Sequence, residues 1–307
     1  MPEFQLKTPV AFIIFNRPDT TERVFAEIAK AKPPKLLVVG DGARANHAGE
    51  ANKVAATRAI INRVDWDCEV LTNYSEINLG CKRRVSSGID WVFEQVEEAI
   101  ILEDDCLPDP TFFRFCQELL ERYRCDDRVM MISGTNLAST EKLHDSYYFS
   151  RYPHIWGWAS WRRMWHQYDV RMELLPQLLR DESFRHSFRT DQEYKHWVRG
   201  LGAVYSGAVD TWDAQVMFMA FRTSGLSIFP KNNLVSNIGF RPDATHTTRE
   251  GGDLDNLPTI PLDYPLRHPT FVYPNLLAES ERKRKEGIGV PKLYKIAKYI
   301  MKRVGVV

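Results

Sequence analysis

Short apolar runs alternate with helical patterns through residues 1–136, and this alternation constrains the fold more than any other feature of the sequence. The runs are continuous, short and rich in β-branched residues, which predicts buried strands. They lie at 10–15, 35–41, 68–74, 98–105 and 129–136. The segments between them predict helices at 19–31, with Asp19 as cap and a stop at Pro33-Pro34, and near 48–63, 81–96 and 109–124. Such spacing predicts right-handed crossovers and a mostly parallel central sheet flanked by helices, a Rossmann-like α/β fold.

The second half of the chain has a different character. Residues 147–168 are crowded with aromatic side chains, and helical patterns follow at 172–199 and 211–224. The segment 241–257 is polar and contains glycine, which predicts a loop. We see no repeat and no low-complexity linker, so we expect the halves 1–136 and 137–260 to share one core. Residues 275–307 form a separate basic tail.

Composition narrows the classes of partner. A chain of 307 residues with 44% hydrophobic content can bury a full core, and its net charge of +1 gives no reason to expect a nucleic-acid partner. Its five cysteines show no CxxC pair, which favours reduced thiols over a disulfide framework. The first residues do not resemble a signal peptide, and no apolar run approaches the length of a membrane span. We therefore expect a cytoplasmic protein.

Polar residues follow the predicted strands directly. In parallel sheets ligands bind outside the carboxyl ends of the strands, so these residues become site candidates. The most unusual group is the run of three acids, Glu103, Asp104 and Asp105, after the apolar residues 99–102. Adjacent carboxylates supply hard oxygen ligands for Mn²⁺ or Mg²⁺, and the cation would relieve their repulsion. The alternative is that they are surface acids where a strand meets a loop.

The motifs around these acids resemble a known family. IILEDD, after a helix entered through NLGCKRR, resembles the Asp-X-Asp-type motif of nucleotide-sugar-dependent glycosyltransferases of the GT-A fold. EDDCLPDPTFFRF is similar to N-acetylglucosaminyltransferase I and its relatives, as are VAFIIFNRPD and VVGDGA. The N-terminal motifs are also similar to those of family 2 glycosyltransferases. The resemblance covers roughly residues 8–136. It implies a GT-A fold in which 1–136 binds the nucleotide sugar and 137–260 forms the acceptor side.

The resemblance also implies roles for single residues. Asp105 would bind the metal, while Glu103 and Asp104 would face the ribose or the donor sugar. The other donor-binding candidates are Asp41 toward the base, Asn16 and Arg17 at the first strand end, and Asn78, Lys82 and Arg83 near the diphosphate or sugar. Two alternatives stay open: Asp41 could simply serve the turn at Gly42, and residues 82–84 could be a solvated helix face.

Sugar transfer also needs a base to accept the proton of the acceptor hydroxyl. The Trp212-Asp213 pair resembles the segment that carries the base in the N-acetylglucosaminyltransferase I family, which implies that Asp213 is the base and that the reaction inverts the anomeric centre. Asp210 and Glu193 are possible replacements. Either aspartate could instead cap the helix that follows, and a retaining mechanism stays open.

Three further residues are candidates from the second half. GT-A enzymes often bring a histidine to the metal, so His246 is a candidate ligand, although a lone loop histidine is more often solvated. Trp156 and Trp158 flank Gly157, and aromatic faces of this kind stack on sugar rings. We expect at least one of the two to line the acceptor or donor pocket; the alternative places them in the core.

The C-terminal tail carries a local excess of positive charge. Nine basic residues and one acid lie between Arg282 and Arg303, and an apolar stripe runs from Leu293 to Val304. A terminal helix of this pattern is typical of binding to anionic lipid, here at the inner face of the cell membrane. The alternative is a helix packed on the domain with its lysines in water. We therefore expect anionic vesicles to bind the full chain but not a chain that ends near Glu281. A lipid-linked acceptor would fit this location.

These features predict a Mn²⁺- or Mg²⁺-dependent glycosyltransferase, one that moves a hexosyl or N-acetylhexosaminyl group from a UDP-sugar to a saccharide hydroxyl in polysaccharide synthesis. Two alternatives are a nucleotidyltransferase that makes nucleotide sugars and a catalytically silent carbohydrate-binding protein. The first would need a glycine-rich phosphate loop after the first strand, and NRPDTT supplies none.

Overall fold

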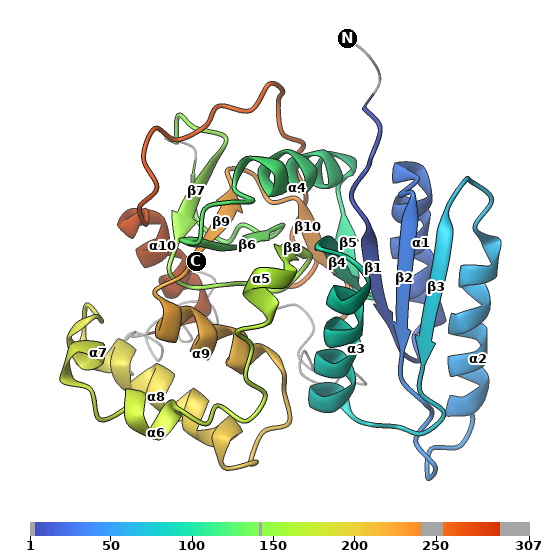
Figure 1. Ribbon diagram of the computed structural model, residues 1–307, viewed down its shortest axis with the longest axis horizontal. Coiled ribbons are helices and arrows are strands. Elements are labelled where there is room, and N and C mark those ends of the chain that lie inside the picture. The colour runs from blue at the N-terminus through green and yellow to red at the C-terminus, as the bar shows by residue number, and fades with distance from the viewer. Residues whose placement is uncertain (1–3, 141–142, 241–253, 289–307) are drawn as a thin grey trace, which may run out of the picture.

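The computed structural model describes residues 4–140, 143–240 and 254–288. Its centre is an eight-stranded sheet with the strand order β3-β2-β1-β4-β8-β6-β9-β7 (Figure 1). The first four are the parallel strands β3 (Glu69–Tyr74), β2 (Lys35–Gly40), β1 (Val10–Ile14) and β4 (Glu98–Glu103). Their bounds agree with the sequence prediction to within two residues. The predicted α/β fold, with a central sheet flanked by helices, is therefore confirmed.

The remaining four strands come from the second half and from the end of the first. They are β6 (Val129–Ser133), β7 (Tyr147–Ser150), β8 (Trp158–Trp161) and β9 (Leu226–Pro230). β8 lies antiparallel between β4 and β6, and β7 runs antiparallel to β9. The parallel arrangement thus holds for the first four strands, and the rest of the sheet is mixed. Because strands of both halves pair in one sheet and share one core, the halves form a single folding unit.

Helices α1 (Pro18–Ala31), α2 (Glu50–Ile60), α3 (Cys81–Gln95) and α4 (Pro110–Arg122) follow the predicted pattern. One detail of the prediction is wrong: α1 begins at Pro18, so Asp19 lies in its first turn instead of capping it. A proline at the first helical position is favourable because the N–H it lacks would have no partner there. α4 starts in the same way, with Asp109 accepting a hydrogen bond from the Thr111 amide (2.9 Å).

Smaller elements complete the second half. The helices α5 (Arg162–Trp165), α6 (Leu175–Leu178), α7 (Glu182–His186), α8 (Asp191–Tyr205) and α9 (Asp213–Thr223) follow β8, and α6 to α9 gather below the sheet in the view of Figure 1. A short ribbon of β5 (Cys106–Pro108) and β10 (Val235–Asn237) lies directly after β4. α10 (Leu276–Glu286) packs against β7. A single-turn 3-10 helix, η1 (Ile61–Arg63), extends α2.

Candidate functional site

The parallel strands β1 and β4 bring Arg17 and the acids after β4 to the same edge of the sheet. Ile13 pairs with Glu103 in the register of the two strands. Just beyond this pair, one guanidinium nitrogen of Arg17 contacts Asp104, and the other donates to Asp105 at 2.8 Å. The backbone amide of Phe15 also donates to Asp104, at 3.1 Å. The family resemblance implies that Arg17 lies at the nucleotide; in the structure its guanidinium clamps Asp104 and Asp105 of the acid run.

The acids at this edge carry more negative charge than Arg17 neutralises. Asp104 and Asp105 are 2% and 8% exposed. Burial raises the pKa of Glu103 well above its ordinary value, and the neighbouring Asp105 and Asp104 raise it further. Burial also raises the pKa of Asp104, against the lowering effect of Arg17. Among the described residues, the Glu103 carboxylate has no ion-pair partner. A raised carboxyl pKa means that these groups resist ionisation unless a further cation stabilises their charge.

The β5–β10 ribbon covers Asp105. Ile238 donates its amide to the Asp105 carbonyl at 2.8 Å, and the next residue, Gly239, lies against the carboxylate. A Cβ at Gly239 would lie 2.1 Å from Asp105 Oδ2, so only glycine fits here. Phe240 follows and contacts the ring of Trp156 edge-on, with 5.7 Å between centroids. His246 lies outside the described residues, and its role as a metal ligand stays a prediction.

Asp41 and Asn78 are brought together at the ends of β2 and β3. The Asp41 carboxylate accepts hydrogen bonds from the Asn78 side chain (3.0 Å) and from the amides of Gly42 (2.9 Å), Leu79 (2.9 Å) and Gly80 (3.1 Å). Burial nevertheless raises the pKa of Asp41. Both carboxylate oxygens thus hold the loop that enters α3. These hydrogen bonds match the alternative in which Asp41 serves the turn at Gly42. Contact between Asp41 and a nucleotide base stays a prediction.

The donor-side candidates Asn16, Lys82 and Arg83 have different surroundings. Asn16 donates to Glu50 at 2.9 Å, and Glu50 also holds Arg44. Lys82 is half-buried and Arg83 is exposed; within the described ranges, neither side chain forms an ion pair.

Arg84 does not belong to a solvated helix face, as one alternative for residues 82–84 assumed. It is 6% exposed, and its guanidinium donates to the carbonyl of Gly40 at 3.2 Å and to the side chain of Asn73 at 2.7 Å. It ties the carboxyl ends of β2 and β3 together. The sequence does not predict these contacts of Arg84, because nothing in its local pattern indicates that a basic residue near a helix start is buried.

Asp213 and Asp210 face the acid run from the other half of the chain. Both are exposed, and Asp213 is close enough to Glu103 to add to its raised pKa. Asp210 Oδ2 would lie 3.3 Å from a Cβ at Gly80, so it borders the start of α3. Neither caps α9: Trp212 is the N-cap residue and no side chain caps the helix. The capping alternative is therefore wrong: both carboxylates are exposed, with Asp213 near Glu103 and Asp210 beside Gly80.

Aromatic side chains from 158–168 hold Trp212 and so position Asp213. The rings of Trp158 and Trp212 are stacked with centroids 6.0 Å apart, and Tyr168 donates its hydroxyl to the Trp212 carbonyl at 3.0 Å. Thr211 donates a hydrogen bond to Asp213 itself. Trp158 is 2% exposed and belongs to the core, so it has no free face for a sugar. Trp156, half-buried beside Phe240, is the member of the pair that can face a ligand.

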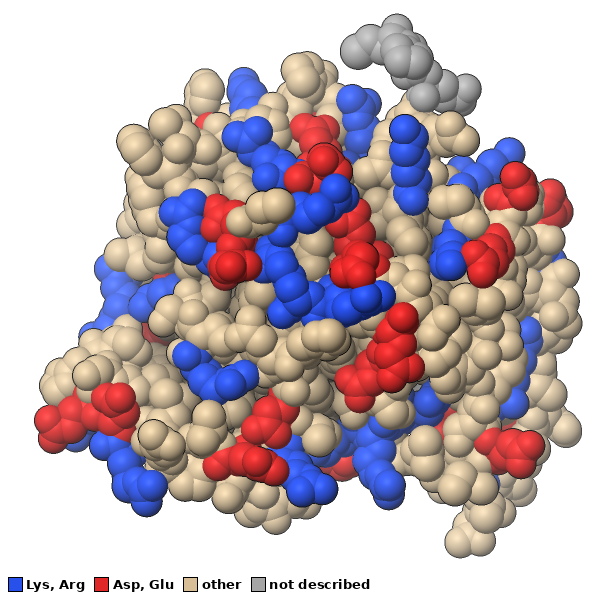
Figure 2. All heavy atoms as spheres, viewed as in Figure 1, with Lys and Arg blue, Asp and Glu red and all other residues tan. Residues whose placement is uncertain are grey.

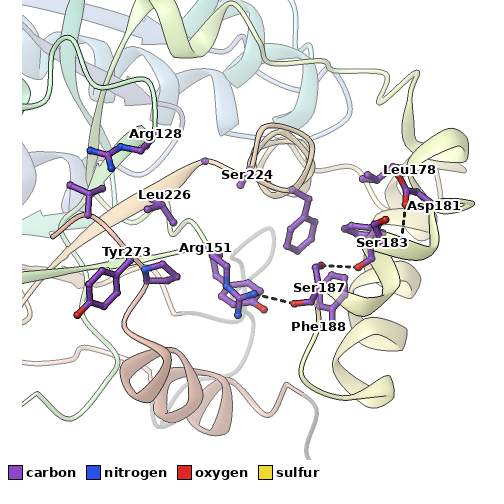
Figure 3. Close-up of a pocket in the computed structure, with 17 residues that line it drawn as sticks. Arg128, Arg151, Leu178, Asp181, Ser183, Ser187, Phe188, Ser224, Leu226 and Tyr273 are labelled. Atoms are coloured by element: carbon purple, nitrogen blue, oxygen red, sulfur yellow. Dashed lines mark hydrogen bonds between the residues drawn. The ribbon is translucent and has the colours of Figure 1, made fainter.

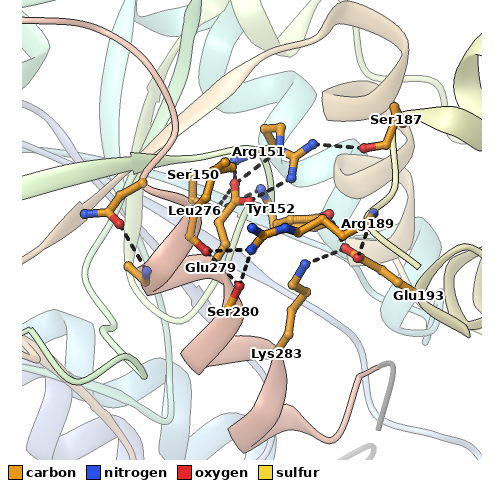
Figure 4. A network of polar contacts seen from close by, with 12 residues as sticks. Ser150, Arg151, Tyr152, Ser187, Arg189, Glu193, Leu276, Glu279, Ser280 and Lys283 are labelled. Carbon is orange, nitrogen blue, oxygen red and sulfur yellow. Dashed lines mark hydrogen bonds and ion pairs between the residues drawn. The ribbon is translucent and has the colours of Figure 1, made fainter.

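Glu193 is not at this site, so it cannot replace Asp213 as base. It is 3% exposed and accepts hydrogen bonds from Lys283 of α10 (2.7 Å) and from Tyr152, as Figure 4 shows. Burial acts to raise the pKa of Glu193, but the bonds from Lys283 and Tyr152 outweigh it and lower the pKa.

The same network corrects the interpretation of the tail. Arg282 and Lys283 were counted as its first basic residues, yet they are only 4% and 8% exposed. Arg282 donates to the carbonyls of Tyr152 (2.7 Å) and Pro153 (3.0 Å). Figure 4 shows that Arg151 pairs with the buried Glu279, at 2.8 Å. These contacts anchor α10 to the domain. Residues 289–307, which carry the predicted amphipathic stripe, lie outside the described residues.

The acid run fits a divalent ion only with help from a ligand. Within the described part of the chain, no three His, Cys, Asp or Glu side chains converge to hold a metal by themselves. Mg²⁺ and similar ions, however, are commonly held by one or two carboxylates together with substrate phosphates and water. Glu103 and Asp105 are the carboxylates that could take part in such a site.

A separate cavity of about 520 Å³ opens at the far end of α9. Phe184, Phe188 and Phe221 line it together with Arg151 and Tyr273 (Figure 3). α9 has 11 residues, so roughly 16 Å of helix separate this cavity from Asp213. The cavity is therefore distinct from the acid site.

No family model matches the chain, and no curated protein matches it. Among solved structures, one similar chain is described as UDP-glucose pyrophosphorylase complexed with UDP-glucose. It is 11% identical with a TM-score of 0.33, over 53% of this chain and 79% of that chain. A likeness of this size does not identify a family.

In the described part of the chain, no helix combines the length and hydropathy needed to span a bilayer. All five cysteines are free thiols, as predicted.

Proposed function

We propose that this protein is a metal-dependent glycosyltransferase that moves a sugar from a nucleotide donor, first of all a UDP-sugar, to a saccharide hydroxyl. The observation that carries the proposal is the meeting of the acid run after β4 with Asp213 at the start of α9. One group is buried and rich in negative charge, as a cation–diphosphate site needs. The other is an exposed carboxylate without a cationic partner among the described residues, as a general base needs.

The residues of this chain divide the work as follows. Asp105, with Glu103 beside it, would hold Mn²⁺ or Mg²⁺ against the donor diphosphate; when bound, the ion supplies charge neutralisation for the leaving group. Lys82 and Arg83 lie at the start of α3 and supply cations for the same diphosphate. Asp213 accepts the proton of the acceptor hydroxyl as its oxygen bonds to the anomeric carbon. The bond from that carbon to the diphosphate breaks, the nucleoside diphosphate leaves, and the configuration inverts.

Two structural features support Asp213 as the base. Thr211 and the Trp158–Trp212–Tyr168 contacts fix its position, so the carboxylate is held without being buried. Trp156 lies on the Phe240 side of the same edge, where its half-buried ring can stack on a sugar. Asp210, next to Gly80, is the alternative base and is tested in the same experiment.

The test compares Asp213→Asn and Asp210→Asn with Asp263→Asn, which alters an exposed carboxylate elsewhere. Release of nucleoside diphosphate is measured over a panel of nucleotide sugars and saccharide acceptors, with and without Mn²⁺. Loss of a general base lowers transfer by about 10²- to 10⁴-fold. We expect this loss in Asp213→Asn only, with an unchanged unfolding midpoint and an unchanged thermal shift on donor binding. Near-normal transfer by Asp213→Asn would remove it from the mechanism.

A further inference from the structure

A patch of exposed apolar side chains lies immediately before α10 and on its first turn. It consists of Phe271, Tyr273, Leu276 and Leu277, which are 66%, 64%, 43% and 80% exposed, and we call it the 271–277 patch. The rings of Phe271 and Tyr273 are stacked, with centroids 6.1 Å apart. Single exposed apolar residues are ordinary on a surface, whereas apolar patches often serve in binding, so four exposed apolar side chains within seven positions call for an explanation.

The patch borders the aromatic cavity at the far end of α9. Val272, Tyr273 and Pro274 line that cavity, and Tyr273 lies at its edge in Figure 3. The opposite wall is apolar and comes from α7 and α9, with Phe184 and Phe221. An apolar group that contacts the patch therefore has a pocket of about 520 Å³ beside it, within the range of pockets that hold small ligands.

Positive charge lies beside the patch on the same helix. Leu277, Arg284 and Lys285 stand at i, i+7 and i+8 of α10 and so share one face. All three are exposed, and in the part of the chain that the structure describes neither cation has an ion-pair partner. Glu281 lies on this face too, but it accepts the Ser139 amide at 2.8 Å. This face of α10 is therefore apolar at Leu277, near its start, and cationic at Arg284 and Lys285, near its end.

The sequence after α10 continues the positive charge. Residues 289–307 contain four lysines and one arginine and no acid. The 271–277 patch is followed along the chain by basic residues. This order matches the layers of an anionic bilayer, in which hydrocarbon lies inside and phosphate lies outside. Binding to a protein partner does not require apolar and basic side chains to follow one another in this order.

We propose that the 271–277 patch and the cationic face of α10 form a docking surface for an anionic lipid membrane. Phe271 and Leu277 enter the boundary between headgroups and acyl chains, and Arg284 and Lys285 contact lipid phosphates. The buried pairs Arg151–Glu279 and Lys283–Glu193 fix α10 to the domain, so the surface is presented at a defined orientation (Figure 4). The proposal does not depend on the reaction that the acid site performs.

The test is cosedimentation of the full chain with phosphatidylglycerol-containing vesicles and with pure phosphatidylcholine vesicles. The double substitution Phe271→Ser/Leu277→Ser removes the apolar contact, and we expect the partition coefficient to fall at least about tenfold. Arg284→Glu/Lys285→Glu removes the cations, and since each basic residue near an anionic surface strengthens binding roughly fivefold, we again expect a fall of at least about tenfold. Phosphatidylcholine vesicles should bind weakly throughout.

Ile77→Ser is the matched control, because Ile77 is an exposed apolar side chain (68%) on another surface. It should bind anionic vesicles like the native chain. Unfolding midpoints of all variants verify that the fold is intact. Native-like binding by the Phe271→Ser/Leu277→Ser variant, or no binding of the native chain to anionic vesicles, would overturn the proposal. So would loss of binding on removal of residues 289–307 with no effect of the patch substitutions, because the tail alone would then be the anchor.

Discussion

Arg17→Met tests whether the acid run is held together by one guanidinium. The substitution keeps the apolar stem but leaves Asp104 and Asp105, 2% and 8% exposed, without their cation. Removing one partner of a buried pair destabilises a protein by about 3–5 kcal/mol. The Arg17 side chain is 22% exposed, so solvent compensates part of the loss and we expect about 3 kcal/mol. At about 2 °C per kcal/mol, the melting midpoint falls by about 6 °C.

The pH dependence of this loss follows from the raised pKa of Asp104. A carboxylate whose pKa is higher in the folded state destabilises the fold while it is ionised, and this penalty vanishes when it is protonated. Removing Arg17 removes a factor that lowers this pKa. The loss in Arg17→Met should therefore be largest near neutral pH and shrink as the pH falls toward and below the pKa of folded Asp104.

The assay is urea unfolding followed by tryptophan fluorescence at several pH values. Arg63→Met is the control, since Arg63 pairs with Glu22 at the surface, and it should leave the midpoint unchanged. In the double variant Arg17→Met/Asp104→Asn part of the stability should return, because one buried charge is gone. A loss below about 1 kcal/mol, or strict additivity with Asp104→Asn, would refute the clamp.

Two further predictions concern other ion pairs. The hydrogen bonds from Arg44 lower the pKa of Glu50 to about 2. The stabilisation that ionised Glu50 gives the fold is therefore fully present above the unfolded pKa of about 4.3 and is lost as the pH falls through about 2. Glu50→Gln should therefore lose about 1 kcal/mol at pH 7, because Arg44 is half exposed, and the difference from the native chain in urea unfolding should close across that window. A chain ending at Glu281 lacks Lys283 and leaves Glu193 buried without its cation, so its melting midpoint should fall by about 6 °C or more; a chain ending at Ile288 keeps this pair and should melt at a higher temperature than the shorter chain.

The truncation also changes how the tail can be tested. Loss of vesicle binding in a chain ending near Glu281 would mix lost lipid contacts with a damaged fold, because residues 282 and 283 are structural. The boundary for such an experiment is Ile288. The sequence does not predict this boundary. A run of basic residues has the same pattern whether its first members face water or pair with a buried glutamate.

The sequence alone determined the parallel half of the sheet and its acid edge. Strands β1, β2 and β4 are continuous apolar runs, so each has to be buried on both faces, and the helices between the strands follow from amphipathic spacing. Parallel strands end at one edge, and polar residues placed directly after them must meet there. For that reason the sequence alone predicts that Arg17, Asp41 and the acids at 103–105 lie at one edge of the sheet.

Only the tertiary structure decided which partner each of these residues has. Arg17 became a clamp because β1 and β4 are neighbours in register. Asp213 came near Glu103 because Trp158 of β8 and Tyr168, beyond α5, hold Trp212. The antiparallel insertion of β8 between β4 and β6 buried Trp158 and left Trp156 half-buried. Contacts over such separations depend on how elements pack, and no local pattern of residues encodes them.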